Sequence, residues 1–393
     1  MSMFTDAEVG IGAADEGRRR SDGAVSLFLT RRPDVDIVRN WDRLVERTPG
    51  TDVTQLSAWA RVRAKWNFSP MYLLARQAGE LVGGAQILSR RLPVLGGVGY
   101  LPYGPVIDPT VDDRLMVRRA LVQGLGRLCR NHLRMLFVQP PEGAEDVSAD
   151  LLAHGFRPSS ADIAPAGSIR IDLAEDLETI RSRFGKTLRR WSAKWEAHGV
   201  TVHLGGERDV PLLAAMVAHS GERHGFSAPP PDYLAALYRE LSAGDNAALF
   251  VGRVHGAPVA ADLVTVCGGM IRGRLAGFDR FSEAARLSMP AAIRWEIIKW
   301  GKERGHRWMD FGGLSAATLD TLIEGGRATG LPSTDQPKLT FGGRPFRYPP
   351  PVELLAPAPL RVAYDVARRS RRGRQAIKGA QRALRGRSAR RPS

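Results

Sequence analysis

Cysteine and long apolar stretches are both scarce in this chain of 393 residues. It holds two cysteines, Cys129 and Cys267, far apart in the sequence. Two isolated thiols predict neither a disulfide framework nor a metal site. No apolar run approaches the roughly 18–20 residues that a membrane-spanning helix needs. The N-terminal residues carry Asp6, Glu8 and Asp15 and no hydrophobic segment, so we expect no secretory signal and a cytoplasmic protein.

Signatures of several common enzyme classes are missing as well. The chain has no Gly-x-Ser-x-Gly sequence around a nucleophilic serine and no Gly-x-x-x-x-Gly-Lys-Ser/Thr phosphate loop. Its His, Cys and Asp residues form no cluster with metal-ligand spacing. We therefore expect neither a bound metal nor a cofactor.

Positive charge is plentiful, with a net charge of +16, but it is unevenly spread. From Arg361 to Ser393 there are twelve Lys and Arg residues and a single acidic residue, Asp365. Such a tail attracts phosphate groups, either of RNA or of an anionic inner leaflet. Its few apolar residues, among them Leu360 and Tyr364, are too sparse for a strong membrane-inserting face. A solvated, disordered terminus is the alternative interpretation.

The order of the expected elements indicates that the chain is duplicated. A strand, a glycine turn and a second strand surround Gly79, and the same pattern with the same offsets surrounds Gly256. Downstream, residues 120–139 are expected to form a helix and then a strand, as are residues 293–311. The spacing between hairpin and helix is nearly equal in the two halves. Repeated order at one long period predicts two copies of an α/β domain.

The length agrees with this prediction, because 393 residues suit two domains of about 150–180 residues, each able to bury a full core. We expect residues 1–24, which are rich in Gly, Asp and Arg, to be disordered. The two domains are expected at residues 25–165 and 166–356. The basic tail then takes residues 357–393.

A basic segment follows the first strand of the second domain. Between residues 181 and 194 six Lys and Arg residues alternate with apolar ones. As a single helix this segment would carry an apolar stripe at Phe184, Leu188, Trp191 and Trp195 and a basic face opposite. That face is either simply solvated or binds a polyanion.

The most informative stretch runs from Arg294 to Gly313. It predicts an amphipathic helix, a glycine turn and a short buried strand that ends in Asp310-Phe311-Gly312-Gly313. Glycine has no Cβ, so such a strand end exposes backbone N–H groups and lets another chain approach closely. Lys338 follows soon after. We expect a ligand site at this strand end, with Lys338 either at its centre or an ordinary surface lysine.

Four motifs together resemble one family. They are Gln-x-x-x-Trp-x-x-x-Arg at 55–63, Tyr-x-Pro-x-Gly-Pro-Val-x-Asp at 100–108, the 294–313 stretch, and Lys338 with Phe341-Gly342. Over about residues 35–350 the chain resembles the FemABX family, aminoacyl-tRNA-dependent transferases that build the interpeptide bridges of peptidoglycan. The resemblance implies an α/β fold of two tandem GNAT-like domains, each a mixed central sheet flanked by helices. No coiled-coil arm is inserted, which is typical of the compact members.

The resemblance also implies an activity and its partners. An enzyme of this family, an acyltransferase, moves an amino acid from aminoacyl-tRNA to an amine of a UDP-linked or lipid-linked muropeptide. The product is an amide bond in a cell-wall bridge, and such an enzyme works in peptidoglycan biosynthesis and cell shape. The implied location is the cytoplasm, with peripheral contact at the inner face of the plasma membrane through the basic tail as an open alternative.

The implied chemistry is aminolysis of an ester that is already activated, so positioning and stabilisation of the tetrahedral oxyanion can supply most of the catalysis. By resemblance, Lys338 lies at the reacting centre, where its charge would act beside the glycine N–H groups. The attacking amine must lose a proton, and Asp108 or the substrate's own groups would accept it. Asp310 is a structural residue or a site residue on equal grounds.

Further residues are implied to bind substrate. Arg63 and Asp108 would contact the muropeptide precursor or its diphosphate, although the family commonly has Lys where this chain has Arg63. Arg223 would match a second phosphate-binding arginine. Pro337 stands where an aromatic residue usually precedes the lysine. The remaining candidates are Phe341 in the lysine motif and Tyr103 as either a groove wall or a packing residue. Arg344 and Arg347 either meet the tRNA 3′ end or form an ordinary solvated face.

Two other functions remain open. The first is an acyl-CoA-dependent N-acyltransferase on the same fold. The loop that such enzymes use for the pyrophosphate, Arg/Gln-x-x-Gly-x-Gly/Ala at a helix start, is approached at residues 123–128 and 274–279 but fails at its last position in both. The second is a non-catalytic protein that binds tRNA or a membrane.

Overall fold

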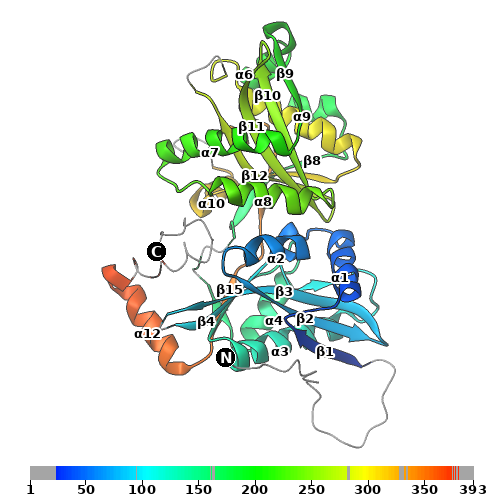
Figure 1. Cartoon of the computed structure of the whole chain (residues 1–393), viewed down its shortest axis with the longest axis vertical. Helices are drawn as coiled ribbons and strands as arrows, with labels where there is room; N and C mark the ends of the chain where they lie inside the picture. The colour runs from blue at the N-terminus through cyan, green and yellow to red at the C-terminus, as the bar shows by residue number, and fades with distance from the viewer. Residues whose placement is uncertain are drawn as a thin grey trace, which may run out of the picture. The chain divides into compact units, whose positions relative to one another are not determined.

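A computed structural model describes residues 24–93, 95–159, 161, 164–280, 284–326, 332, 335–373, 375, 377 and 379. The segment 1–23, where we expect disorder, lies outside the described residues. The described chain forms two compact units (Figure 1). The first unit runs to Ala164 and resumes at Pro349, and the second unit is Pro165–Tyr348.

The first unit is built on one mixed sheet with strand order β1-β2-β3-β4-β6-β15-β7, while β5 pairs with β3. Its strands are β1 (Val25–Thr30), β2 (Ser69–Gln77), β3 (Glu80–Leu92), β4 (Gly96–Pro102), β5 (Val106–Ile107), β6 (Met135–Gln139), β7 (Arg157–Pro158) and β15 (Val352–Leu355). Its helices are α1 (Val35–Arg47), the 3-10 turn η1 (Val53–Gln55), α2 (Ser57–Ala64), α3 (Arg114–His132), α4 (Glu145–Ala153) and α12 (Ala358–Arg369).

The second unit has its own mixed sheet, with strand order β14-β8-β13-β12-β11-β10-β9. Its strands are β8 (Gly167–Asp172), β9 (Val200–Gly205), β10 (Ala247–Val254), β11 (Ala257–Cys267), β12 (Met270–Phe278), β13 (Trp308–Gly313) and β14 (Arg344–Arg347). Its helices are α5 (Leu177–Ser182), α6 (Lys186–Ser192), η2 (Glu196–His198), η3 (Glu207–Asp209), α7 (Val210–His224), α8 (Pro231–Ser242), α9 (Met289–Glu303), α10 (Ala316–Ile323) and α11 (Gln336–Leu339). Within the described residues, no helix is both long and apolar enough to cross a bilayer.

The two sheets repeat one topology, which confirms the predicted α/β fold of two related domains. Strands β1-β2-β3-β4-β6 correspond in order to β9-β10-β11-β12-β13, and in each series only the last pair is parallel. A long helix, α3 or α9, makes that parallel connection. The hairpin turns match as well: Ala78-Gly79 and His255-Gly256 both have positive φ at each residue, which is typical of a type I′ turn.

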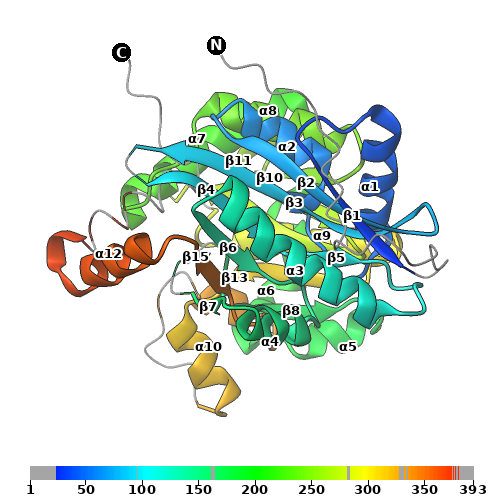
Figure 2. The ribbon, with the colours of Figure 1, turned by 90° about the horizontal axis from the view of Figure 1, so that it is seen from below.

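Helices cover both faces of the first sheet (Figure 2). A Cβ on Gly83 would lie 3.1 Å from the Val117 side chain of α3, whereas one on Gly84 would lie 2.9 Å from the ring of Trp41 on α1. Successive residues of a strand point to opposite faces, so α3 and α1 pack on opposite sides. Glycine in this part of β3 allows both helices to approach the sheet closely.

The boundary between the units differs from the one expected at residue 356. Residues 352–355 form β15, which lies between β6 and β7 in the first sheet and contributes Val352 and Leu354 to its core. The corresponding position in the second sheet, beside β13, is taken by β8. The sequence of a short apolar strand does not predict which sheet the strand joins. Its pairing depends on an unpaired strand edge that is distant in the sequence. The tail expected from residue 357 begins as α12, which packs against β15.

The single helix expected over residues 181–194 is instead two short helices, α5 and α6. Gly185 interrupts them, since it has extended backbone angles and its N–H donates to the carbonyl of Thr340 (2.8 Å). The predicted apolar stripe is nevertheless inward: Phe184, Leu188 and Trp195 are buried. A tertiary hydrogen bond at Gly185 thus divides the expected helix into two. These apolar side chains remain buried.

We expect Leu354→Ala to lower the free energy of unfolding of the first unit by about 2–5 kcal/mol, because it leaves a cavity in a packed core. Val366→Ala, on the exposed side of α12, should cost less than about 0.5 kcal/mol. Urea unfolding, with hydrogen exchange of the β6 amides as the local reporter, measures both. Equal effects of the two substitutions would contradict the position of β15.

Candidate active site

A buried carboxylate organises the end of β13. Asp310 is 1% exposed and accepts hydrogen bonds from the hydroxyl of Ser168, the hydroxyl of Tyr348 (2.5 Å) and the Nε of Arg170 (3.3 Å). It also accepts from the backbone N–H of Gly312 (2.8 Å). These partners come from β8, from β13 itself and from the residue that follows β14. Asp310 therefore ties three segments together and acts structurally.

The sheet opens at this point. Parallel pairing of β12 with β13 ends at Arg272–Asp310, whereas the equivalent pair in the first unit continues from Val98 through Pro102. Beyond Asp310, β13 pairs only with β8. Gly312 has a φ of +83° and lies so close to Gly273 that a Cβ would meet its carbonyl oxygen at 3.2 Å. Glycine is thus required here by conformation and by close backbone approach.

The N–H group of Gly312 is not free, contrary to what we expected of this strand end. The N–H of Gly312 is used by Asp310, and the N–H of Leu314 donates to the carbonyl of Gly167 (2.9 Å). The carbonyl of Gly313 instead faces a cation, because the Nζ of Lys338 donates to it. The structure therefore brings Lys338 to the glycine end of β13. There the backbone contributes a carbonyl acceptor to Lys338, whereas we expected backbone N–H donors for a ligand.

Lys338 is held in a sheltered position by α11. Its side chain is 14% exposed, and its Nζ lies 3.9 Å from the Oδ1 of Asp335. Burial lowers the pKa of Lys338, the charge of Asp335 opposes that shift, and the charge of Arg294 adds to it. Asp335 is fixed in turn by the hydroxyl of Thr318 (2.7 Å). Lys338 is thus a positioned ammonium group whose surroundings favour loss of its proton more than water does.

A second cation, which we had noted only as the start of a motif, lies near the first. Arg294 of α9 has its Nε 3.9 Å from the Oδ2 of Asp262 on β11. Its guanidinium also lies 5.6 Å from the ring centre of Phe311. Burial raises the pKa of Asp262 to about 7, although the charge of Arg294 opposes this. Two cations, Lys338 and Arg294, therefore act on one strand end, an arrangement suited to an anionic ligand or a developing oxyanion.

Comparison with known proteins bears on the fold and on the class of protein. Residues 167–318 match the family model of an acetyltransferase (GNAT) domain. The UDP-N-acetylmuramoylpentapeptide-lysine N(6)-alanyltransferase of Weissella viridescens is 22% identical over 302 residues, which cover 74% of this chain and 88% of that protein. A lipid II:glycine glycyltransferase of Staphylococcus saprophyticus is 24% identical over 242 residues, 56% of each protein. This chain is therefore similar to two aminoacyltransferases whose names give peptidoglycan precursors as acceptors.

The structural comparison extends over most of the chain. A crystal structure of FemX has a TM-score of 0.71 at 15% identity and covers 84% of this chain and 98% of its own. At that identity the likeness concerns the fold. The family resemblance, the tandem GNAT-like fold and the transferase class predicted from the sequence are confirmed.

Other predicted residues of the second unit have packing or surface positions. Phe341 is 1% exposed, and its ring centre lies 4.8 Å from that of Phe311 and 5.2 Å from that of Phe184. It therefore packs in the core beneath the lysine segment, where the rings of Phe311 and Phe184 cover it. Arg223 lies in the last turn of α7, and its side chain lies outside the described residues.

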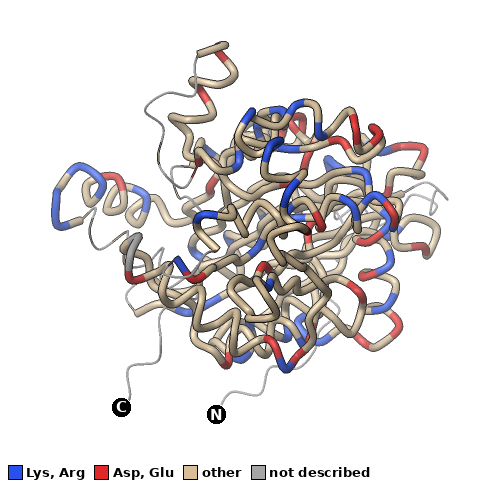
Figure 3. Tube along the Cα trace, turned by 90° about the horizontal axis from the view of Figure 1, so that it is seen from above, with Lys and Arg blue, Asp and Glu red and all other residues tan. Residues whose placement is uncertain are grey.

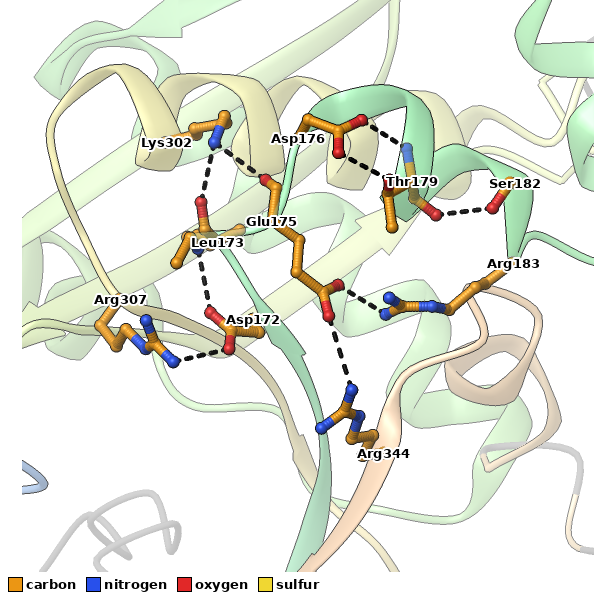
Figure 4. Close-up of polar contacts among 11 residues, drawn as sticks. Asp172, Leu173, Glu175, Asp176, Thr179, Ser182, Arg183, Lys302, Arg307 and Arg344 are labelled. Atoms are coloured by element: carbon orange, nitrogen blue, oxygen red, sulfur yellow. Dashed lines mark hydrogen bonds and ion pairs between the residues drawn. The ribbon is translucent and has the colours of Figure 1, made fainter.

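Arg344 lies in a charged cluster on the surface (Figure 4). Its side chain is 70% exposed, and its guanidinium is 3.5 Å from the Oε1 of Glu175, which is also bound by Arg183 (2.6 Å). Arg347 pairs with Asp320 (2.6 Å). Exposed arginines with loosely held partners can exchange them for phosphate, so Arg344 suits contact with a polyanion better than an enclosed substrate site.

The candidates of the first unit are largely enclosed. Arg63 is buried in the last turn of α2, with its guanidinium 4.1 Å from the ring centre of Phe68. Tyr103 is buried in a turn with a φ of +52°. Asp108 accepts from the N–H (2.9 Å) and hydroxyl (2.7 Å) of Thr110 on one oxygen and from Arg47 on the other.

These contacts change the expected role of Asp108. Burial favours the neutral acid, but the hydrogen bonds from Thr110 and the charge of Arg47 outweigh burial, and the pKa of Asp108 is lowered. A carboxylate with a lowered pKa is a weak proton acceptor. The lowered pKa therefore argues against Asp108 as the proton acceptor, and Thr110 and Arg47 hold its ionised form.

We expect Asp310→Asn to lower the free energy of unfolding of the second unit by about 3–5 kcal/mol, because buried arginine charge loses its counter-charge. Asp320→Asn, which removes a pair between half-exposed side chains, should cost less than about 1 kcal/mol. Chemical unfolding at pH 7 compares the two. A cost for Asp310→Asn as small as that of Asp320→Asn would remove the organising role of this carboxylate.

A pH dependence follows from Asp262. Between about pH 4 and 7 the folded protein retains a proton on Asp262 that the unfolded chain has lost, so this group's contribution to stability falls as pH rises. It is fully present below the unfolded pKa and is lost through pH 7. We expect the stability of the wild type relative to Asp262→Asn to decrease from pH 4 to pH 7.5. A difference that is constant across this range would contradict the raised pKa.

Proposed function

We propose that this protein transfers an amino acid from aminoacyl-tRNA to a primary amine of a UDP-linked or lipid-linked muropeptide. The names of two homologues support the reaction class: one is an alanyltransferase of a UDP-linked muramoylpentapeptide lysine, the other a glycyltransferase of lipid II. In both cases an amide is formed on a peptidoglycan precursor. The proposed product here is likewise a peptide bridge of the cell wall.

The observation that carries this proposal is the position of Lys338 at the open end of β13, with Arg294 behind it. In aminolysis the amine attacks the ester carbon, a C–N bond forms, and the carbonyl oxygen becomes an oxyanion. Collapse of this intermediate breaks the C–O bond to the ribose. A positioned cation stabilises the oxyanion more than the neutral ester. Lys338 is the proposed stabilising group, and Arg294 adds positive potential.

The proton of the attacking amine passes, in our proposal, to the departing ribose oxygen, which needs one proton to leave as a hydroxyl. Asp108 is a weak base for the reason given above, so its proposed role is an ionised contact to the precursor. Arg63 and Tyr103 are proposed to shape the same region of the first unit. Arg223, Arg344 and Arg347 are proposed phosphate contacts, the last two to tRNA. Charged tRNA is an intracellular molecule, so the proposed site of action is the cytoplasm.

The direct test is mass spectrometry of UDP-linked and lipid-linked muropeptides after incubation with a mixed pool of charged tRNAs. We expect a product heavier by one aminoacyl residue. Lys338→Met should lower kcat by about 10²–10³-fold with little change in KM, because it removes a group that acts on the transition state. Lys186→Met, which removes an exposed charge, should change kcat less than twofold.

Three results would contradict the proposal. Unchanged turnover in Lys338→Met would remove the catalytic assignment. Acylation of the acceptor by an acyl-CoA, with none from any charged tRNA, would favour the acyl-CoA alternative, which the GNAT domain match also supports. Binding of tRNA without transfer under any condition would favour a non-catalytic role.

A further inference from the structure

The first unit carries a basic groove that the proposed reaction does not use. It has a volume of about 980 Å³ and is lined by the end of α3, the β3–β4 hairpin and Pro357. Three arginines line it: Arg91, Arg130 and Arg134. Of the described residues that line this groove, none is acidic. Its positive charge is therefore uncompensated within the groove, which favours anionic ligands.

The groove continues directly into α12. The N–H of Arg134 donates to the carbonyl of Gly97 (2.8 Å), and its carbonyl accepts from the N–H of Ala356 (2.9 Å). Pro357, which lines the groove, is also the N-cap residue of α12. The Arg134 side chain crosses Gly96 so closely that a Cβ there would lie 2.8 Å from its Cδ. Backbone hydrogen bonds thus hold the groove and the start of α12 together.

The inward face of α12 is fixed to the sheet. Tyr364 is buried, and Asp365 accepts two hydrogen bonds from one nitrogen of Arg157 (2.8 and 2.9 Å). Arg157 also binds Glu353 of β15 (3.0 Å). Asp365 is the single acidic residue of α12, so this ion pair removes the helix's negative charge from its outer side.

The outward face of α12 is both apolar and basic. Val362 and Val366, one helical turn apart, are each 59% exposed. Arg361, Arg369 and Arg371 are exposed around them, and Figure 3 shows the concentration of Lys and Arg along this part of the chain. The exposed valines show that the outer face has an apolar patch of its own.

We propose that the groove and the outward face of α12 together dock on an anionic phospholipid surface. Arginines bind lipid phosphates, and an interfacial helix buries apolar side chains just below them. Further basic residues between Arg374 and Arg391 add to the attraction. RNA would also bind the arginines, but contact with RNA phosphates does not account for two exposed valines. If the protein transfers an amino acid to a muropeptide as proposed above, docking at a bilayer would bring it to the lipid-linked muropeptide. This choice of acceptor rests on the proposed function.

The test is co-sedimentation of the full-length protein with vesicles of phosphatidylcholine alone or mixed with phosphatidylglycerol. We expect at least tenfold stronger binding to the anionic vesicles at low salt. Val362→Ser with Val366→Ser should weaken that binding at least fivefold. Arg91→Gln with Arg134→Gln should weaken it and flatten its salt dependence.

Matched controls are Val35→Ser, an exposed valine of α1, and Arg32→Gln with Arg39→Gln, exposed arginines of the same unit. These should bind vesicles as the wild type does. Equal binding to neutral and anionic vesicles would overturn the proposal, as would valine variants that bind as the wild type does. Arginine variants that lose tRNA binding but retain vesicle binding would assign the groove to RNA instead.

Vesicle binding and transfer are measured separately, so the two proposals can fail separately. If the protein does not bind anionic vesicles but still transfers an amino acid to a UDP-linked muropeptide, only the proposed docking surface is contradicted. Docking without transfer to either acceptor would remove only the proposed reaction. Transfer to lipid-linked acceptor that falls with the valine variants, while transfer to the UDP-linked one is unchanged, would support both.

Discussion

The candidate site depends on one buried carboxylate and the cations that surround it. Asp310 joins β13 to β8 and to the segment after β14, and Arg170 and Arg272 approach it from neighbouring strands. A buried charge without a partner is costly, so each member of this cluster restrains the others. The end of β13 is therefore rigid, and Lys338 meets the Gly313 carbonyl at a defined place. Stabilisation of a developing charge requires such a preorganised cation.

The two copies of the fold differ at the strand pair where chemistry is proposed. In the first unit the parallel pair is closed along its length, and the side chain of Gln139 at its end donates to the carbonyl of Pro349 (2.6 Å). In the second unit the pair opens after Asp310, and cations lie at the opening. One topology can thus have a parallel strand pair that is closed along its length in one copy and open at its end in the other.

Part of the site could be predicted from sequence, and part could not. The nearness of Lys338 to the Asp-Phe-Gly-Gly strand end was implied by the family resemblance, because its spacing alone left an ordinary surface lysine open. The role of Asp108 did not, because its protonation is set by Thr110 nearby and by Arg47, which is distant in sequence. Phe341 was grouped with the lysine by its motif, but its surroundings are the rings of Phe184 and Phe311. A motif identifies a candidate residue and its position in the sequence. The chemistry of that residue depends on the side chains that surround it in the fold.

The sequence alone determined the duplication and the hairpin turns. These depend on local periodicity, on glycine's access to positive φ and on short spacings. Only the tertiary structure decided that β15 joins the first sheet, that Gly185 divides a helix, and that α12 turns Val362 and Val366 outward. Each of these depends on a distant partner that fills a strand edge, a carbonyl or a helix face. Local sequence encodes the tendency to be buried or paired, but not the identity of the partner.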